Sequence, residues 1–252
     1  MRLGCALGGA SIGLALSLYS GGAIAQDHSG PVSEAAPYGA PVDDQHVWVH
    51  GILDQFEGRF DSENSLRWDG EAWAGTDSDR LWLKSEGELT KGKLQDGQQE
   101  AYYSKPISTY FDLQVGARYD LDSLSGRGWA AIGVEGLAPQ FFHVSATAYA
   151  SDEGHFAAKF TGSYDLLITQ RLILQPEAEI NLYSKNDASR GIGSGFSDLD
   201  TGIRLRYEFS RKFAPYVGLV YEKKFGRTGK YASASGENTD ALRVVAGVRA
   251  WF

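Results

Sequence analysis

Apolar and polar side chains alternate with a period of two over long stretches of this chain. The clearest stretch covers residues 198–209. Its apolar face would carry Leu199, Thr201, Ile203, Leu205, Tyr207 and Phe209, and its other face Asp198, Asp200, Gly202, Arg204, Arg206 and Glu208. Successive side chains of an extended strand point to opposite faces, whereas a helix would mix the two sets. The pattern therefore predicts a strand with one apolar and one largely charged face.

The same alternation recurs in residues 109–120, 171–183 and 241–252. Strands of soluble sheets average about 5–6 residues, which is much shorter. Ten residues at about 3.4 Å each, tilted by about 40°, rise about 26 Å, and this matches the apolar band of about 25 Å in an outer-membrane barrel. A water-soluble β-sandwich is the alternative, but it seldom uses such long strands. We therefore predict an all-β fold, an antiparallel transmembrane β-barrel.

Twelve segments qualify as barrel strands. They are residues 46–59, 65–74, 79–89, 99–105, 109–120, 127–136, 141–150, 155–165, 171–183, 197–209, 214–225 and 241–252. Ten strands is the alternative count, because 79–89 and 99–105 alternate less regularly, as 155–165 also does. The even-numbered connections are short, and the odd-numbered ones include the long segments 90–98, 184–196 and 226–240. Short periplasmic turns and longer outer loops are typical of outer-membrane barrels.

The chain before residue 46 has a different character. Residues 1–25 begin with Met1-Arg2, continue with an apolar segment and end on Ala23-Ile24-Ala25, which predicts a secretory signal peptide. Residues 26–45 are polar and contain several Pro and Gly, which predicts a short, disordered and flexible periplasmic lead. The barrel would then occupy residues 46–252. The only Cys and the only Met belong to the signal peptide, so the mature chain contains no disulfide or thiolate.

Charged side chains occupy many inward positions of the predicted strands. They are Asp112, Arg118, Glu177, Glu179, Asp198, Asp200, Arg204, Arg206, Glu208, Arg243 and Arg249. In a closed barrel these groups share one lumen, where they form either a mesh of ion pairs that fills the interior or a polar permeation path. The formal net charge of −8 argues against a nucleic acid as a partner.

The sequence does not indicate an enzyme. His143 and Ser145 share one face of a predicted strand, but they would lie about 7 Å apart, too far for direct proton transfer. No Gly-x-Ser-x-Gly elbow occurs in a strand–turn–helix context. Covalent catalysis is therefore not expected.

Histidines are the remaining candidates for chemistry, as metal ligands. The candidates are His28 in the lead, His46 and His50 at the start of the first strand, and His143. His46 and His50 would lie about 13 Å apart along one strand face, so they cannot chelate one ion by themselves. Each could join ligands from the lead or from another strand. The alternative role for each histidine is a hydrogen bond inside the lumen.

Several strings carry a resemblance to a known family. They are Leu53-Asp54-Gln55, Trp82-Leu83-Lys84, Tyr110-Phe111-Asp112-Leu113-Gln114, Gly136-Leu137-Ala138-Pro139, Gln170-Arg171-Leu172-Ile173-Leu174-Gln175-Pro176, Gly191-Ile192-Gly193-Ser194-Gly195, Phe213-Ala214-Pro215-Tyr216 and the ending Trp251-Phe252. In this order, over residues 46–252, the sequence resembles the copper resistance protein B family of bacterial outer-membrane proteins.

The resemblance implies a barrel in the bacterial outer membrane that binds copper ions and exports or sequesters them. It also implies a periplasmic multicopper oxidase of the same resistance system as a partner. Membrane lipid would surround the barrel, and the terminal Phe252 is typical of the signal read by the barrel-assembly machinery. A passive pore or structural barrel without specific copper binding is the alternative function.

The ligand types bear on the oxidation state of that copper. Imidazole suits Cu(II), whereas Cu(I) prefers thioether or thiolate ligands. The four candidate histidines therefore favour Cu(II). Members of the family often carry a Met- and His-rich lead, but residues 26–45 contain one His and no Met. The resemblance therefore transfers no copper-binding residue to this chain.

Overall fold

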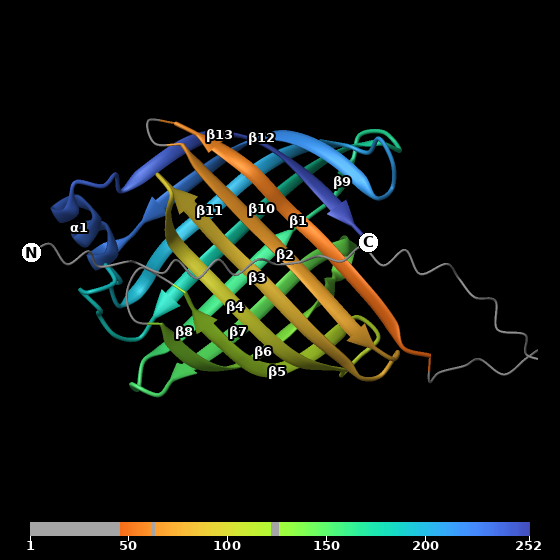
Figure 1. Cartoon of the computed structure of the whole chain (residues 1–252), viewed down its shortest axis with the longest axis horizontal. Coiled ribbons are helices and arrows are strands. Elements are labelled where there is room, and N and C mark those ends of the chain that lie inside the picture. Colours follow the sequence, from red (N-terminus) through yellow and green to blue (C-terminus); the bar gives the residue numbers. More distant parts are fainter. Residues whose placement is uncertain (1–45, 62–63, 122–125) are drawn as a thin grey trace, which may run out of the picture. The chain divides into compact units, whose positions relative to one another are not determined.

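The computed structural model describes residues 46–61, 64–121 and 126–252. The predicted signal peptide (1–25) and lead (26–45), with the candidate ligand His28, lie outside the described residues. The described part of the chain folds almost entirely into strands (Figure 1).

One antiparallel sheet contains all the described strands, and it closes on itself because β1 pairs with β13. The strands are β1 (Trp48–Phe60), β2 (Ser65–Gly75), β3 (Arg80–Thr90), β4 (Lys93–Pro106), β5 (Phe111–Asp120), β6 (Arg127–Ala138), β7 (Phe142–Ser151), β8 (Phe156–Ser163), β9 (Leu166–Leu167), β10 (Leu172–Tyr183), β11 (Gly195–Tyr207), β12 (Phe213–Lys224) and β13 (Asp240–Trp251). Because β8 and β9 both pair with the same side of β10, these 13 strands occupy twelve positions around the barrel. The predicted barrel is confirmed, and twelve rather than ten is the right count.

The eighth predicted strand is interrupted between β8 and β9. β8 pairs with Glu177–Tyr183 of β10, and β9 pairs with Ile173 and Leu174. Between them the backbone N–H of Tyr164 donates to the carbonyl of Pro176 at 3.1 Å. The N and O atoms of one strand residue face the same neighbour, so the missing N–H of Pro176 lies on this side. The ladder loses a donor there, which explains the break.

The predicted loop at residues 90–98 is wrong. β3 and β4 are joined by two residues only, Lys91 with φ 53° and Gly92 with φ 75°. Positive φ at both positions is the type I′ geometry, whose twist matches that of the strands on either side. The polar run after Gly92 therefore continues as a strand, and β4 begins earlier than predicted.

A β-bulge reverses the inward and outward positions within β1. Leu53 pairs with Gly70 and Gln55 pairs with Asp69, so Asp54 is an extra residue on its strand. Before the bulge Val49 faces outward, with 76% of its surface exposed. After it Phe56 and Phe60 face outward, whereas Gln55, Glu57 and Arg59 are buried in the interior. An extra residue shifts the two-residue period by one, which moves every following side chain to the other face.

The two faces of β11 separate as predicted. Ile203, Leu205 and Tyr207 are exposed on the outside of the barrel, whereas Arg204 and Arg206 are 3% and 2% exposed inside it. Other strands contribute apolar side chains to the same outer surface. Among these exposed side chains are Leu81, Leu83, Val115, Ile132, Phe160, Val217, Leu219 and Val244. This exposed apolar surface is suited to contact with the hydrocarbon of a bilayer, because apolar side chains form no hydrogen bonds that the lipid would have to satisfy.

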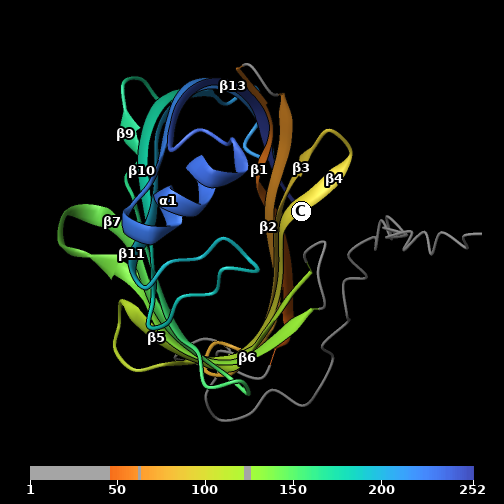
Figure 2. The same cartoon turned by 90° about the vertical axis from the view of Figure 1, so that its left-hand side faces the viewer.

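The long connections gather at one end of the barrel. The segment between β12 and β13 was predicted as a loop, but it contains the helix α1 (Gly226–Ser235). Figure 2 looks at this end, and α1 lies across it. The buried Thr228 hydroxyl accepts a hydrogen bond from the backbone N–H of Gly193 at 2.8 Å and lies 3.0 Å from the Ser197 hydroxyl. These contacts attach α1 to the neighbouring loop and to β11. Within the described ranges, no helix is long and apolar enough to cross a membrane.

The other end carries the short turns and the last residue of β13. One turn includes a short 3-10 helix, Pro139–Phe141. The backbone N–H of Phe252 donates to the carbonyl of Gly51 at 2.8 Å, so the chain ends against the beginning of β1. In outer-membrane barrels the short turns lie on the periplasmic side. We therefore orient this end toward the periplasm.

Candidate functional site

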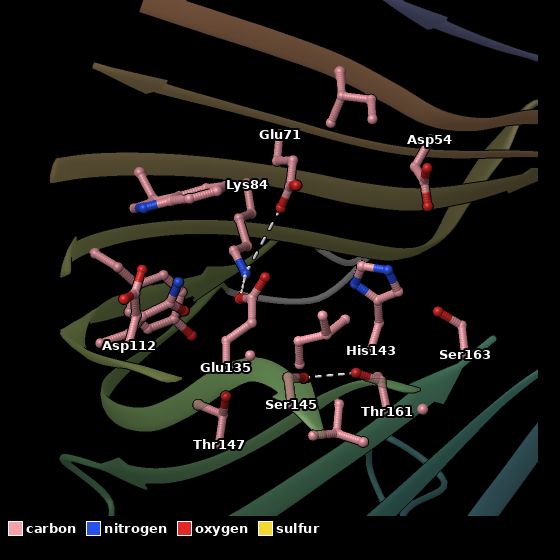
Figure 3. Close-up of a pocket in the computed structure, with 18 of the residues that line it drawn as sticks. Asp54, Glu71, Lys84, Asp112, Glu135, His143, Ser145, Thr147, Thr161 and Ser163 are labelled. Carbon is pink, nitrogen blue, oxygen red and sulfur yellow. Dashed lines mark hydrogen bonds and ion pairs between the residues drawn. The ribbon is translucent and has the colours of Figure 1, made fainter. Parts of the chain in front are cut away.

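A cavity of about 860 Å³ lies inside the barrel and reaches the end that carries the short turns. Residues from those turns belong to its wall, among them Asp77, Ser108 and Tyr110. Figure 3 shows several of the side chains that line it. The cavity is therefore on the periplasmic half of the lumen.

Acidic side chains dominate the wall of this cavity. The eleven acidic residues are Asp54, Asp69, Glu71, Asp77, Glu86, Glu100, Asp112, Glu135, Asp165, Glu177 and Glu179, and the four basic ones are Arg80, Lys84, Lys159 and Arg249. The formal surplus is seven negative charges. A cleft lined by one sign of charge with low-dielectric walls concentrates ions of the opposite sign. The cavity is therefore electrostatically suited to cations.

The strand register places these charges on neighbouring positions of the wall. Lys84 of β3 lies directly opposite Glu71 of β2 on one side and Glu100 of β4 on the other. Across the lumen, Glu135 of β6 is paired with Asp112 of β5. Cross-strand neighbours have Cβ atoms about 4.5–5.5 Å apart, so charges on one rung interact directly.

Each cation of the wall is bound to carboxylates. The Lys84 Nζ atom lies 2.5 Å from Glu135 and 3.7 Å from Glu71 (Figure 3). The Lys159 ammonium contacts Glu86 at 2.6 Å and Glu179 at 3.4 Å. Arg249 bonds Asp54 at 2.5 Å, and Arg80 bonds Asp112 at 3.1 Å. These pairs confirm that the lumen contains a mesh of ions, while leaving carboxylates in excess around the cavity.

Asp69 is one of the carboxylates in excess. It lines the cavity, where Glu86 and Asp54 act on it as nearby like charges and Lys159 and Arg67 as nearby cations. Its carboxylate therefore belongs to the network of charges in the wall and adds to the negative potential that attracts cations.

The structure separates the predicted histidine ligands. His143, near the start of β7, lines the cavity, and Figure 3 shows its ring directed inward in the same region as Asp54. His50 instead packs between Trp73 and Trp251, with ring centroids 5.9 and 5.2 Å away. Its Nδ1 atom lies 2.9 Å from the backbone oxygen of Phe252.

His46 stacks edge-on against Trp48 at 4.3 Å, before the first paired residues. Among residues 46–61, 64–121 and 126–252, only His143 of the predicted ligands belongs to the cavity wall. No three His, Cys, Asp or Glu side chains in these ranges converge closely enough to hold a metal ion by themselves. His143 is therefore the histidine that can meet the acidic groups, and His46 and His50 have structural contacts at the rim.

The Ser145 hydroxyl lies 2.6 Å from that of Thr161, its register partner on β8. This contact gives Ser145 a structural partner across the two strands. His143 lies two residues away on the same strand, as the sequence indicates.

A buried cluster of charges lies next to the cavity, on β1, β10, β11 and β12. At its centre the Glu57 carboxylate, which is fully buried, accepts hydrogen bonds from Arg59, Arg204 and Tyr216 at 2.9–3.0 Å. Arg204 also donates to Glu177 at 3.0 Å, and Glu177 lines the cavity. We call Glu57, Arg59, Arg204, Glu177 and Tyr216 the Glu57 cluster.

The sequence prediction of inward residues omitted Glu57 and Arg59. They follow the bulge in β1, where the period has shifted. A signal for this existed in the alternation of Phe56, Gly58 and Phe60 with Gln55, Glu57 and Arg59, which has the opposite phase to Val47 and Val49. This change of phase within the first strand is the sequence signal of the bulge.

The turns at both ends of the barrel carry further charges. Hydrogen bonds from Tyr103 and Ser78 hold the pKa of the Asp79 carboxyl, in the turn between β2 and β3, below its usual range. At the opposite end, burial would raise the pKa of Asp187, but hydrogen bonds from Ser189 and Arg127 keep it below its usual value. Both carboxylates therefore stay ionised across the physiological range.

The family model and the relatives that match this chain carry the same description. The family model described as copper resistance protein B precursor (CopB) matches residues 47–252. Copper resistance protein B of Escherichia coli is 40% identical over 215 residues, which cover 85% of this chain and 73% of that protein. The copper resistance protein B homolog of Pseudomonas syringae pv. tomato is 41% identical over the same length and shares of each chain.

Two porins are among the solved structures with a similar fold. The KdgM porin aligns with a TM-score of 0.52 and 12% identity, over 80% of this chain and 99% of its own. The NanC porin aligns with a TM-score of 0.54 and 13% identity, over 81% and 99%. At this identity the likeness concerns the barrel fold.

Proposed function

The chain belongs to the copper resistance protein B family of bacterial outer-membrane proteins, and from that premise we propose that it binds copper ions on the periplasmic side of the outer membrane and sequesters or exports them. The observation that carries the proposal is the acidic cavity with His143 in its wall. Such a cavity attracts cations from the periplasm and offers them one nitrogen ligand among many oxygens.

The donor set fits Cu(II) better than Cu(I). Imidazole and carboxylate suit divalent copper, and copper binds more tightly than other first-row divalent ions to a given site of this type. The only Cys and Met of the sequence are Cys5 and Met1, so the barrel has no soft sulfur ligand for Cu(I). His143 would supply a nitrogen ligand to the cargo ion, and the surplus of carboxylates in the cavity would attract that ion electrostatically.

The proposal includes partners that act before and after the barrel. Lipid would cover the apolar outer surface, and the barrel-assembly machinery would insert the chain into the membrane. A periplasmic multicopper oxidase of the same resistance system would supply copper in the divalent state. In this proposal the cavity exchanges ions and performs no covalent step.

We expect His143→Ala to weaken Cu²⁺ binding by roughly tenfold or more, since loss of an outer partner of a ligand already costs about 10–100-fold. The measurement is a Cu²⁺ titration of the folded barrel in detergent micelles, followed by calorimetry. His155→Ala is the matched control, because His155 lies on the opposite end near Arg127 and Glu153. Equal affinity in His143→Ala and wild type would remove His143 from the site.

The histidines at the rim need a separate comparison. We expect His46→Ala/His50→Ala to bind Cu²⁺ as the wild type does, because the two side chains contact Trp48, Trp73 and Trp251 rather than the cavity. A large loss of affinity in this double variant would instead assign them to the site, together with groups of the lead. The same titration decides both questions.

A passive pore or structural barrel is the second candidate function. The mesh of ion pairs in the lumen favours a structural barrel, because these pairs occupy part of the interior. Conductance in planar bilayers separates the two candidates. Ion flow without copper preference, together with no measurable copper affinity, would favour the passive barrel.

A further inference from the structure

The helix α1 lies across the outer end of the barrel, opposite the end that the cavity reaches (Figure 2). Among the described residues, those that line the cavity belong to strands and short connections, and none belongs to α1 or to residues 184–196. Thr228, Gly229 and Ala232 of the helix are buried. An ion in the cavity is therefore separated from the outside by α1 and by the ion pairs of the lumen.

The sequence of α1 gives the helix little stability of its own. Its ten residues include two glycines, a threonine and two serines, all of which have a lower helix propensity than alanine. The N-cap residue, Phe225, forms no side-chain hydrogen bond to the first turn. Isolated helices shorter than about 12–15 residues are marginal in water even when they are rich in alanine. The helix therefore depends on contacts with the barrel, and elements of this kind open locally in native proteins.

The hydrogen bonds that attach α1 to the barrel are found at its N-terminal end. The Thr228 hydroxyl accepts a hydrogen bond from the backbone N–H of Gly193 at 2.8 Å and lies 3.0 Å from the Ser197 hydroxyl. The carbonyl of Ser197 accepts a second hydrogen bond, from the backbone N–H of Phe225 at 2.7 Å. At the C-terminal end, the backbone N–H of Gly236 donates to carbonyls of the helix itself. We call Gly193, Ser197 and Thr228 the lid contact.

The barrel side of the lid contact has a local geometry that admits the helix. Ser197 is the extra residue of a β-bulge between Phe196 and Asp198 of β11, and a bulge re-aims a side chain out of the regular alternation. Gly193 allows the close approach of the two segments, because a Cβ atom there would lie 2.5 Å from the backbone nitrogen of Thr228. A larger residue at this position therefore displaces the helix.

We propose that α1 is a lid on the outer end of the lumen, that the lid contact holds it closed, and that release of this contact opens the lumen to the outside. This rests on the proposed function, because the lid determines when an ion taken up from the periplasm leaves the barrel. With the lid contact formed, the barrel sequesters the ion. With the contact released, the ion has an exit, so sequestration and export are two states of one barrel.

A fixed plug is the competing explanation for α1. In that case the helix would only stabilise the loops at the outer end, and the ion pairs of the lumen would close it whether or not α1 is attached. The lid differs, because it requires that ion flow follow the state of the lid contact. The flow of K⁺ through the barrel therefore separates the two roles, and this measurement needs no affinity for copper.

The first experiment locks the lid with a disulfide. The only Cys of the sequence is Cys5, in the predicted signal peptide, so Ser197→Cys/Thr228→Cys introduces the sole pair of thiols in the barrel. The two hydroxyls lie 3.0 Å apart, and sulfur atoms in their place need to approach by about 1 Å to form a bond of about 2.05 Å. We expect the variant cross-linked with diamide to carry at least tenfold less K⁺ current in planar bilayers than the same protein reduced with dithiothreitol. Equal currents in the cross-linked and reduced protein would overturn the proposal.

The second experiment releases the lid. Gly193→Ala places a methyl group against the backbone of Thr228, and Thr228→Val removes the hydroxyl while it keeps the shape of the side chain. We expect both variants to carry more K⁺ current than the wild type, Thr228→Val by roughly fivefold, the factor for one net hydrogen bond. The matched controls, Gly128→Ala and Ser233→Ala, should conduct as the wild type does. A Cβ atom at Gly128 meets open space, and Ser233 is an exposed residue of α1.

Exposure of the lid contact provides a readout that does not depend on current. Ser197, which is 1% exposed, is replaced by Cys and labelled in detergent micelles with a maleimide joined to a polyethylene glycol chain. We expect Ser197→Cys/Thr228→Val to be labelled roughly fivefold faster than Ser197→Cys alone, for the same reason. Equal labelling rates would mean that α1 is fixed, and the proposal would fall.

Absence of K⁺ current in every variant would also overturn the lid, because the ion pairs would then close the lumen without α1. Thr228→Val keeps the test decisive if Gly193→Ala does not fold. Absence of Cu²⁺ binding in the titration of the wild type would instead overturn the proposed function. The two failures are therefore distinguishable, since the first concerns K⁺ flow and labelling and the second concerns copper affinity.

Discussion

Replacing Glu57 with alanine is expected to lower the free energy of unfolding by about 3–5 kcal/mol, the range for removal of one partner from a buried ion pair. The Glu57 carboxylate is fully buried and accepts hydrogen bonds from Arg59, Arg204 and Tyr216. Without it, two arginine side chains that are 1–4% exposed lose their shared anion. The measurement is urea-dependent unfolding from lipid vesicles, followed by tryptophan fluorescence.

The control for this experiment is Glu237→Ala. Glu237 also binds a cation, Lys224 at 2.8 Å, but its side chain is 59% exposed. Exposed pairs contribute about 0–1 kcal/mol, so this variant should unfold within about 0.5 kcal/mol of the wild type. A loss below about 1 kcal/mol in Glu57→Ala would mean that Arg59 and Arg204 find other anions, and the Glu57 cluster would then not be a stabilising unit.

An arginine on the outer face of β11 should be nearly as harmful. We expect Ile203→Arg to lower the free energy of unfolding in vesicles by about 2–4 kcal/mol, because a guanidinium at the bilayer midplane loses its hydration. Ile203 is 53% exposed on the outside of the barrel, near the middle of β11 and beside Leu219 of β12.

Ile203→Phe is the matched variant, because it changes size and shape on the same face but stays apolar. It should fold as well as the wild type. If Ile203→Arg is equally harmless in vesicles, water rather than hydrocarbon surrounds this face, and the membrane assignment of the outer surface is wrong. The next residue, Arg204, faces the interior at 3% exposure, so the two positions test opposite sides of one strand.

Local chemistry explains how far the strands could be predicted. A period of two separates the side chains of an extended chain regardless of what surrounds it, and β11 and β13 follow the predicted faces closely. Prediction was weaker where a single residue changes the geometry. Gly92 allows a two-residue turn, Pro176 interrupts the ladder of β8, and Asp54 reverses the faces of β1.

The helix α1 was missed for a different reason. Its sequence, rich in Gly and Ser, has low helix propensity, and the helix depends on contacts with the barrel. Thr228 bonds Gly193 and Ser197, which belong to other segments. A single-sequence pattern contains no information about such contacts.

The candidate site could also be predicted only in part from the sequence. The sequence identified His143 as a possible ligand and placed many charges in the lumen, but it also grouped His46 and His50 with them. The structure places those two at the rim, where the His50 ring packs between Trp73 and Trp251.

The sequence by itself determined that the chain forms long strands with one apolar and one charged face, because an extended backbone directs successive side chains to opposite faces. Only the tertiary structure decided which charges meet. Arg204 and Glu57 are 147 residues apart, and Lys84 and Glu135 are 51 apart on β3 and β6. Their meeting depends on how the sheet closes and on the stagger between its strands, and no local pattern contains that information. The acidic cavity and the position of His143 in its wall are therefore products of barrel closure.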